Sequence, residues 1–206
     1  MYKLRYSKAS PYVRKILLCV HHLGLENKLT IENADTSEPN DTLFNQNPVG
    51  RIPILLKQDG TSLYDSRVIM DFLERQSDKS LFPEEGDLRD LALTQAALGE
   101  GLIDSAILWV YAEKYSGDQP APELWRTHQL GKIKNGCNYL EQHISKWQPP
   151  EPHAGAAITL AACLGYLSFR NVFNWSRDRP KLTKWYQVVA LNLPGFEITA
   201  PDQEWK

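Results

Sequence analysis

The segment SKASPYVRK, residues 7–15, places two hydroxyl side chains and a proline directly before a predicted helix. Ser is a favoured N-cap residue and Pro suits the first helical position, so Ser10 is expected to cap a helix that begins at Pro11. The start of a helix also presents free N–H groups and the positive end of the helix dipole, which hold anions. Ser10 could therefore cap the helix, take part in binding an anion at the helix start, or do both.

The first eighty residues contain the elements that would position this serine. YKLRY reads as a strand, residues 11–24 as a helix that ends at a glycine, and KLTIEN as a second strand, which together form a βαβ unit. After a polar loop, PILLK and TSLY flank the turn signal Asp59-Gly60 and predict an antiparallel hairpin, and DSRVIMDFLERQ predicts a helix. The order βαβ, loop, ββα is that of an α/β thioredoxin-like domain.

The remainder of the chain is predicted to be all-helical, with Pro- and Gly-containing breakers such as SGDQPAP, QPPEPHAG and SRDRP between the helices. The expected helices are Asp87–Tyr115, Pro122–Trp147, Thr159–Asn174 and Pro180–Asn192. The polar stretch SDKSLFPEEGD reads as a linker. The predicted domains are therefore 1–77 and 87–206, joined by a linker at 78–86.

The bulk composition favours a soluble protein with a small-molecule or protein partner. The chain has 206 residues, of which 42% are hydrophobic and 23% charged, and its formal net charge is -2. This balance offers no electrostatic footprint for nucleic acid or an anionic membrane. The first residues lack an apolar signal segment and the longest apolar run falls short of the ~20 residues that span a bilayer, so a cytoplasmic location is expected.

Neither a disulfide framework nor a metal site is expected. Cys19, Cys137 and Cys163 are odd in number, widely spaced and flanked by apolar helical pattern, which is typical of buried structural thiols. The five His residues are scattered, and none pairs with a Cys at ligand spacing.

Three motifs, SPYVRK, NPVGRIPIL and LYDSRVIMDFL, resemble in this order the glutathione-binding segments of the cytosolic glutathione S-transferases (GSTs), as in bacterial-type GST-like proteins. GLIDSAI and ITLAACLGYLSFR resemble the fourth and sixth helices of that family, so the resemblance covers essentially the whole chain. It implies a thioredoxin-like N-terminal domain, an all-α C-terminal domain, glutathione as cosubstrate, no metal, and a homodimer. It further implies a detoxification chemistry in which the glutathione thiolate attacks a small hydrophobic electrophile or a peroxide.

The resemblance gives Ser10 the place of the catalytic serine of some classes, and Ser7 that of the catalytic cysteine of the beta-like class. A thiol with a pKa of ~8.5 is only a few per cent thiolate at neutral pH, and lowering that pKa by about two units takes roughly 2.7 kcal/mol. A hydrogen bond to a charged acceptor contributes about 1.5–3 kcal/mol, so one hydroxyl at a helix start is sufficient. Ser10 is the first candidate, Ser7 the second and Tyr6 the third, with a purely capping Ser10 as the alternative.

The second motif contains a proline that the family holds in the cis form. The resemblance therefore implies a cis Ile52-Pro53 bond, although only about 5–6% of X-Pro bonds are cis in folded proteins. It also implies that Ile52 exchanges strand-like hydrogen bonds with the cysteinyl part of glutathione. Gly50 is expected to supply a tight turn and Arg51 to be a solvated charge, while Pro53 without the resemblance reads as an ordinary strand-start proline.

In the third motif, Asp65 and Ser66 open a predicted helix. The resemblance assigns the γ-glutamyl carboxylate of glutathione to the Ser66 hydroxyl and the helix N–H groups, and the γ-glutamyl ammonium to Asp65. The alternative is that one of the two residues merely caps the helix. Arg67 is either recruited to the site or solvated.

The second substrate is expected to contact aromatic side chains. The resemblance favours Tyr12, Trp109 and Tyr111 as the pocket wall, although helical aromatics are more often core residues. Asp104 is expected either to reach glutathione across a dimer interface or to remain a solvent-facing or interhelical carboxylate.

The sixth helix departs from the family pattern, which has a Ser or Thr N-cap and an Asp three positions on. Thr159 is present as the expected N-cap, but Ala162 replaces the Asp, so half of the capping box is missing.

The set of Ser10, Pro53, Asp65 and Ser66 favours a glutathione transferase. One alternative is a non-catalytic binding or scaffold protein with the same fold. Another is a glutathione-dependent disulfide reductase, although positions 7 and 10 are both Ser and offer no protein thiol.

Overall fold

The structure is a computed structural model that describes residues 1–36, 38, 42–147 and 152–202. Its contacts divide the chain into two compact units: Met1–Leu81 with the segment from Leu193 onward, and Phe82–Asn192. In contrast, the sequence pattern assigns the segment from Leu193 onward to the helical domain. The domain limits 1–77 and 87–206 stay a prediction. Parts of the predicted polar loop (37 and 39–41) and of the breaker QPPEPHAG (148–151) lie outside the described residues.

The first unit is built on a four-stranded sheet with the order β2-β1-β3-β4. The strands are β1 (Tyr2–Tyr6), β2 (Leu29–Asn33), β3 (Ile54–Leu56) and β4 (Ser62–Leu63). β2 runs parallel to β1, whereas β3 pairs antiparallel with both β1 and β4. The predicted βαβ unit and the hairpin at Asp59-Gly60 are confirmed, and the unit has the thioredoxin-like fold.

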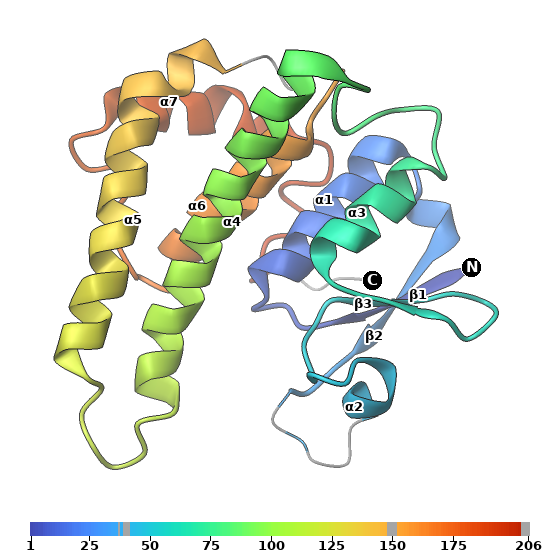
Figure 1. The fold of residues 1–206 in the computed structure, drawn as a ribbon, viewed down its shortest axis with the longest axis horizontal. Coiled ribbons are helices and arrows are strands. Elements are labelled where there is room, and N and C mark those ends of the chain that lie inside the picture. Colours follow the sequence, from blue (N-terminus) through green and yellow to red (C-terminus); the bar gives the residue numbers. More distant parts are fainter. Residues whose placement is uncertain (37, 39–41, 148–151, 203–206) are drawn as a thin grey trace. The chain divides into compact units, whose positions relative to one another are not determined.

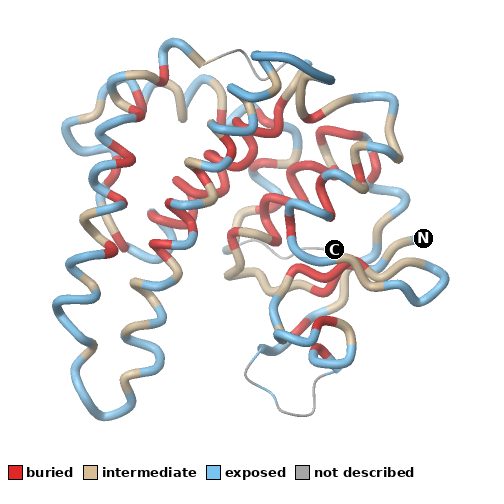
Figure 2. The backbone as a smooth tube through the Cα atoms, viewed as in Figure 1, coloured by how far each residue is buried: buried red, intermediate tan, exposed pale blue. Residues whose placement is uncertain are grey.

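Helices α1 (Pro11–Leu23) and α3 (Ser66–Glu74) pack against each other on one face of this sheet, and the short α2 (Leu43–Gln46) lies on the other face (Figure 1). Most residues of α1 are buried (Figure 2), and the helix ends where Gly24 adopts a φ of 69°, the left-handed C-cap. A 3₁₀ turn follows at Glu26–Lys28. The sequence pattern missed α2, because four residues are too few to produce a helical period.

The second unit is helical over its described residues, as predicted. Its helices are α4 (Gly86–Lys114), α5 (Glu123–His143), α6 (Gly155–Phe169) and α7 (Pro180–Val188), with 3₁₀ turns at Ile144–Lys146 and Ala190–Asn192. α6 is almost entirely buried, and α4 packs against both α5 and α6. α4 is long and apolar enough to cross a membrane by length and composition alone, and 33% of its apolar stretch is buried inside the structure.

The expected N-cap role of Thr159 is wrong. α6 begins four residues earlier at Gly155, with Ala154 as its N-cap and no side-chain hydrogen bond at the cap. Thr159 lies inside the helix, where its hydroxyl donates to the Gly155 carbonyl at 2.8 Å. The reason is that small apolar residues precede Thr159 and continue the helical pattern backwards, so burial of this stretch decides where the helix begins.

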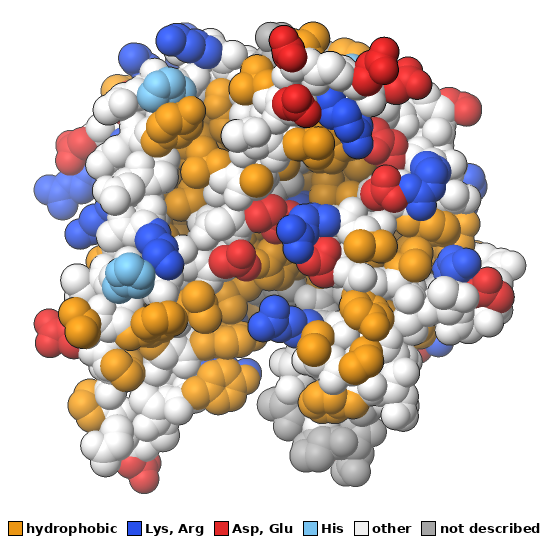
Figure 3. Space-filling model, viewed as in Figure 1, with side chains coloured by type: hydrophobic (Ala, Val, Ile, Leu, Met, Phe, Trp, Pro, Cys, Tyr) orange, Lys and Arg blue, Asp and Glu red, His pale blue; other side chains and the backbone are white. Residues whose placement is uncertain are grey.

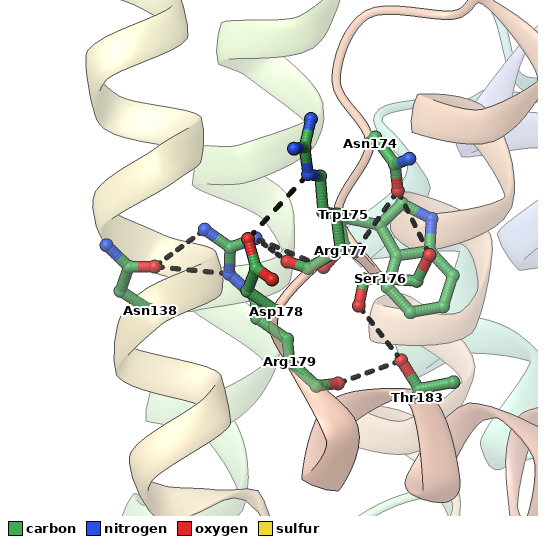
Figure 4. A network of polar contacts seen from close by, with 8 residues as sticks. All are labelled: Asn138, Asn174, Trp175, Ser176, Arg177, Asp178, Arg179 and Thr183. Atoms are coloured by element: carbon green, nitrogen blue, oxygen red, sulfur yellow. Dashed lines mark hydrogen bonds and ion pairs between the residues drawn. The ribbon is translucent and has the colours of Figure 1, made fainter.

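Polar contacts join α7 to α5 (Figure 4). Arg179 donates to Asn138 Oδ1 through Nη2 at 2.7 Å and Nε at 3.1 Å, and its carbonyl accepts from the Thr183 hydroxyl at 2.8 Å. Glu141 of α5 accepts from the backbone N–H of Leu182 at 2.9 Å, so a side chain of the neighbouring helix satisfies the start of α7.

Two glycines of α5 lead to a prediction about helix packing. A Cβ at Gly136 would lie 2.5 Å from Leu102 Cδ2 of α4, whereas a Cβ at Gly131 has nothing within 4 Å. Gly136→Ala should therefore destabilise the protein by about 1–3 kcal/mol through overpacking. Gly131→Ala, the matched control, should stabilise it by roughly 0.5–1 kcal/mol through helix propensity. Urea denaturation measures both values, and equal effects from the two changes would contradict the close approach of α4 and α5.

Candidate active site

The sheet register brings the first two sequence motifs to one end of the first unit. β1 and β3 are antiparallel, with Arg5 opposite Ile54. Continuing that register by two residues places Ser7, which follows β1, beside Ile52, which precedes β3. The serines before α1 and the Ile52-Pro53 bond therefore lie at the same edge of the sheet.

The third motif reaches the same edge. β3 and β4 are antiparallel, with Leu55 opposite Leu63, so the residue pair Asp65 and Ser66 leaves β4 at the end where Pro53 enters β3. α3 begins there, and α1 begins at the end of β1. Two helix N-termini, both of which favour anions, consequently lie at one end of the sheet.

Ser10 is the N-cap of α1, as predicted. Its Oγ accepts a hydrogen bond from the backbone N–H of Val13 at 3.3 Å, and its own N–H donates to the Ser7 carbonyl at 3.0 Å. Among the described residues none accepts the proton of the half-buried Ser10 hydroxyl, so that proton can be donated to a ligand. The Ser7 side chain is also half-buried but stands outside the helix, before the cap.

The turn before β3 is held by a residue that the sequence reasoning missed. Asn47 is only 2% exposed, its Nδ2 donates to the Arg51 carbonyl at 2.9 Å, and its Oδ1 accepts from the Val49 N–H at 3.2 Å. Its signal was the Asn-Pro dipeptide, which marks an Asx-type turn. Gly50 adopts a φ of 60° here, as expected for the tight turn, and the Ile52-Pro53 bond is cis, as the resemblance implies.

Asp65 caps α3 and is held by Arg67. Its Oδ1 accepts from the Arg67 backbone N–H at 2.9 Å, and its Oδ2 accepts from Arg67 Nη2 at 2.8 Å. Partial burial by itself raises the pKa of Asp65, but the hydrogen bonds from Arg67 and the charges of Arg67 and Lys15 outweigh it and lower that pKa below its ordinary value. Asp65 is therefore anionic at neutral pH, and Ser66 beside it is only 2% exposed.

The four residues expected around the second substrate lie on α1 and α4. Tyr12 is half-buried on α1, with the Lys15 ammonium 5.8 Å from its ring centroid. On α4, the Trp109 ring centroid lies 3.9 Å from the Arg126 guanidinium of α5, and Asp104 and Tyr111 are exposed. Their contact with a second substrate stays a prediction.

Two cavities are associated with these units. One of about 350 Å³ is lined by residues at the turn between α4 and α5, among them Tyr111, Tyr115 and Trp125. Hydrophobic side chains also gather on the surface at this end of the helices (Figure 3). The other, of about 490 Å³, includes Tyr2 and Asp59 in its lining and lies at the end of the sheet opposite the serines. Of these two cavities, the one at the α4–α5 turn involves a residue expected in the pocket wall, Tyr111.

The three thiols are buried and unpaired with one another, as predicted. Burial raises the pKa of Cys137 to about 11, although the charge of Arg179 opposes this, and burial raises the pKa of Cys163 well above its ordinary value. Among the described residues, no group of three or more His, Cys, Asp or Glu side chains could hold a metal ion.

These thiols should be inert in the native protein. A disulfide-exchange reagent at neutral pH should react with Cys19, Cys137 and Cys163 only as fast as the protein unfolds, because each thiol is buried and a protonated thiol is a poor nucleophile. Stopped-flow absorbance measurements without and with urea give the reaction rates of the thiols in the native and in the unfolded protein. A fast native phase would show that one of the thiols is accessible.

The comparisons with known proteins agree on one family. A family model for the glutathione S-transferase N-terminal domain matches residues 9–76. A glutathione transferase family member from Pseudomonas fluorescens Pf-5, solved with bound glutathione, is 34% identical, with a TM-score of 0.88 and coverage of 98% of this chain and 99% of that one.

Two further relatives extend this similarity. A glutathione S-transferase from Methylobacillus flagellatus KT, solved with glutathione bound, is 27% identical, with a TM-score of 0.88 and coverage of 98% and 100% of the two chains. The uncharacterized GST-like protein YibF of Escherichia coli K12 is 28% identical over 186 residues, which are 88% of this chain and 90% of that protein. Together with the sheet, the cis proline and the paired helix starts, these matches show that the chain belongs to the glutathione S-transferase family.

Proposed function

We propose that this protein is a glutathione S-transferase that ionises the thiol of glutathione at Ser10 for attack on a small electrophile or a peroxide. The observation that carries the proposal is the Ser10 hydroxyl, which caps α1 through its oxygen and still has a proton to donate. The glutathione bound in the structures of the two similar transferases supports the choice of cosubstrate.

In the proposed complex, the cysteinyl and γ-glutamyl parts of glutathione each have a partner of matching chemistry. The backbone of Ile52 pairs with the cysteinyl part, as an added strand would. The buried Ser66 hydroxyl and the N–H groups of α3 hold the γ-glutamyl carboxylate, and Asp65 holds the ammonium. Since Arg67 already donates to Asp65 Oδ2, the ammonium must share that carboxylate or displace the 74% exposed Arg67 side chain.

Ser10 is preferred to Ser7 as the group that stabilises the thiolate. Ser10 stands at the N-terminus of a 13-residue helix, where the hydroxyl and the helix dipole act on the same atom, whereas Ser7 lies before the cap. The disulfide-reductase alternative would need the thiols of glutathione itself, because Cys19, the nearest cysteine in the chain to Ser10, is fully buried.

The setting of the reaction completes the proposal. The second substrate is a small hydrophobic molecule, for which Tyr12 on α1 and Trp109 and Tyr111 on α4 are the candidate contacts, and Asp104 is the candidate to reach glutathione in a homodimer. We propose that the protein acts in the cytoplasm. The face drawn in Figure 3 carries both acidic and basic side chains. A detoxification role follows from the reaction class.

Glutathione titration of the wild type and of three variants tests the proposal. Calorimetry measures binding, and the ultraviolet absorbance of the thiolate, followed against pH, gives the pKa of the bound thiol. Ser10→Ala should raise that pKa by about one to two units, because the lost hydrogen bond to the anion is worth about 1.5–3 kcal/mol. Ser10→Gly retains most of the capping stability and should raise it equally, whereas Ser7→Ala should leave it unchanged.

The outcomes distinguish a transferase from a scaffold protein, and Ser10 from Ser7 as the residue that stabilises the thiolate. No binding of millimolar glutathione to the wild type would favour the scaffold alternative and overturn the proposal. A thiol pKa that rises with Ser7→Ala instead would transfer the role to Ser7.

Asp65 and Asp71 form a matched pair of acidic residues on one helix. Asp65→Asn should keep the cap of α3, because Asn caps as well as Asp, but should weaken glutathione binding about tenfold or more by removing the charge opposite the ammonium. Asp71, which is exposed and pairs with Arg75 one turn on, provides the control: Asp71→Asn should change the affinity by less than about twofold. Calorimetry at neutral pH measures both, and equal affinities for the two variants would remove Asp65 from the site.

A further inference from the structure

The segment that follows the helical unit returns to the first unit and lies against α1. Leu193, Phe196 and Thr199 in this segment are between 3% and 8% exposed. Gly195 has a φ of +76°, and a Cβ there would lie 2.2 Å from the ring of His21 on α1. The fit leaves no room for a side chain, so this segment is part of the packing of the thioredoxin-like unit.

Arg14 of α1 holds the segment with its guanidinium. Its Nη2 donates to the Phe196 carbonyl at 3.0 Å, and its central carbon lies 4.4 Å from the centroid of the Phe196 ring. The Thr199 hydroxyl donates to the same carbonyl at 3.3 Å. Arg14 is only 6% exposed, and a planar guanidinium can stack on a ring and donate in its plane at once, which an ammonium cannot do.

The same residue closes the turn that carries Ser10. The backbone N–H of Arg14 donates to the Ser10 carbonyl at 3.1 Å, while the Ser10 hydroxyl accepts from Val13. Arg14 is therefore bonded through its backbone to the cap and through its side chain to the segment at Phe196. Arg14 therefore couples the Ser10 cap to the segment at Phe196.

Helix α1 has no acidic side chain in its first turn, and Arg14 and the fully buried Lys15 follow directly. Cations near the N-terminus of a helix oppose the helix dipole, so the contacts of the Arg14 side chain with Phe196 are what favour an arginine at position 14.

We propose that Arg14 is a positioning residue for the reaction assigned above to Ser10. Its hydrogen bond to the Phe196 carbonyl and its contact with the Phe196 ring, together called the clasp, fix the first turn of α1 and thus the direction of the Ser10 hydroxyl. This role rests on the proposed function. Arg14 acts through Ser10 and touches neither glutathione nor the electrophile.

Three variants test the clasp. Arg14→Lys keeps the charge and removes the planar fork, and Phe196→Leu keeps an apolar side chain and removes the ring. Thr199→Val is the matched control, because it removes the other hydrogen bond to the Phe196 carbonyl and leaves Arg14 in place. Two measurements are made: hydrogen exchange of the amides at 193–202, and steady-state kinetics with glutathione and chlorodinitrobenzene.

Arg14→Lys and Phe196→Leu should speed amide exchange in the segment and lower kcat roughly tenfold, with KM for glutathione changed less than about twofold, because a misdirected hydroxyl impairs the transition state more than binding. Thr199→Val should leave kcat within about twofold of the wild type. Wild-type exchange and kcat in Arg14→Lys would overturn the clasp, and an equal loss in Thr199→Val would remove the specific role of Arg14. Failure of the wild type to bind glutathione would instead overturn the proposed function, while the exchange measurement would still report on the clasp.

Discussion

The antiparallel pairing of β1 with β3 decides where the chemistry of the first unit can take place. β1 leads into α1, and because β3 runs the other way it begins at the end where β1 finishes. β4 reverses direction again and therefore finishes at that end too, where α3 starts. Three connections that are far apart in sequence thus meet at one edge. A register slip of one residue in β3 would turn its side chains to the opposite faces and misplace the cis proline.

The two helix N-termini at this edge both carry the positive end of a helix dipole, but their cap residues differ in charge. At α1 the cap is a neutral hydroxyl that accepts from the helix and keeps a donor for a ligand. At α3 the cap is a carboxylate that is already engaged by Arg67. A donor at one helix suits an anion such as a thiolate, and an anion at the other suits an ammonium. The two helix starts together therefore suit a ligand that carries both charges.

The sequence predicted the parts of this arrangement that depend on local signals. Strand alternation, the Asp59-Gly60 turn and the Ser-Pro helix start each have a pattern of their own, and the structure contains all three. The cis form of Ile52-Pro53 came from the family resemblance, because sequence alone favours trans. Thr159 was misjudged because burial of the preceding small residues, a tertiary effect, extends α6 backwards.

Other features had no local signal. The bonds of Asn47 depend on how the loop closes on itself, and the contact of Arg14 with Phe196 joins residues 182 positions apart. The structure places Ser10, Ile52 and Asp65, which the resemblance selected, at one edge of the sheet, and their roles toward a ligand stay predictions.

The electrostatics of α1 follow from these long-range contacts. Arg14 and Lys15 are buried on a helix that has no acidic residue in its first turn, so both place positive charge near the end where Ser10 lies. Asp65 on α3 offsets part of it, since the charge of Lys15 helps to lower the pKa of that carboxyl. A bound thiolate would offset more, because the proposed site lies at the N-terminus of α1 beside the Ser10 hydroxyl. The positive charge and the helix N-terminus would therefore stabilise an anionic ligand, and the contacts of Arg14 with Phe196 help to hold this turn in place in its absence.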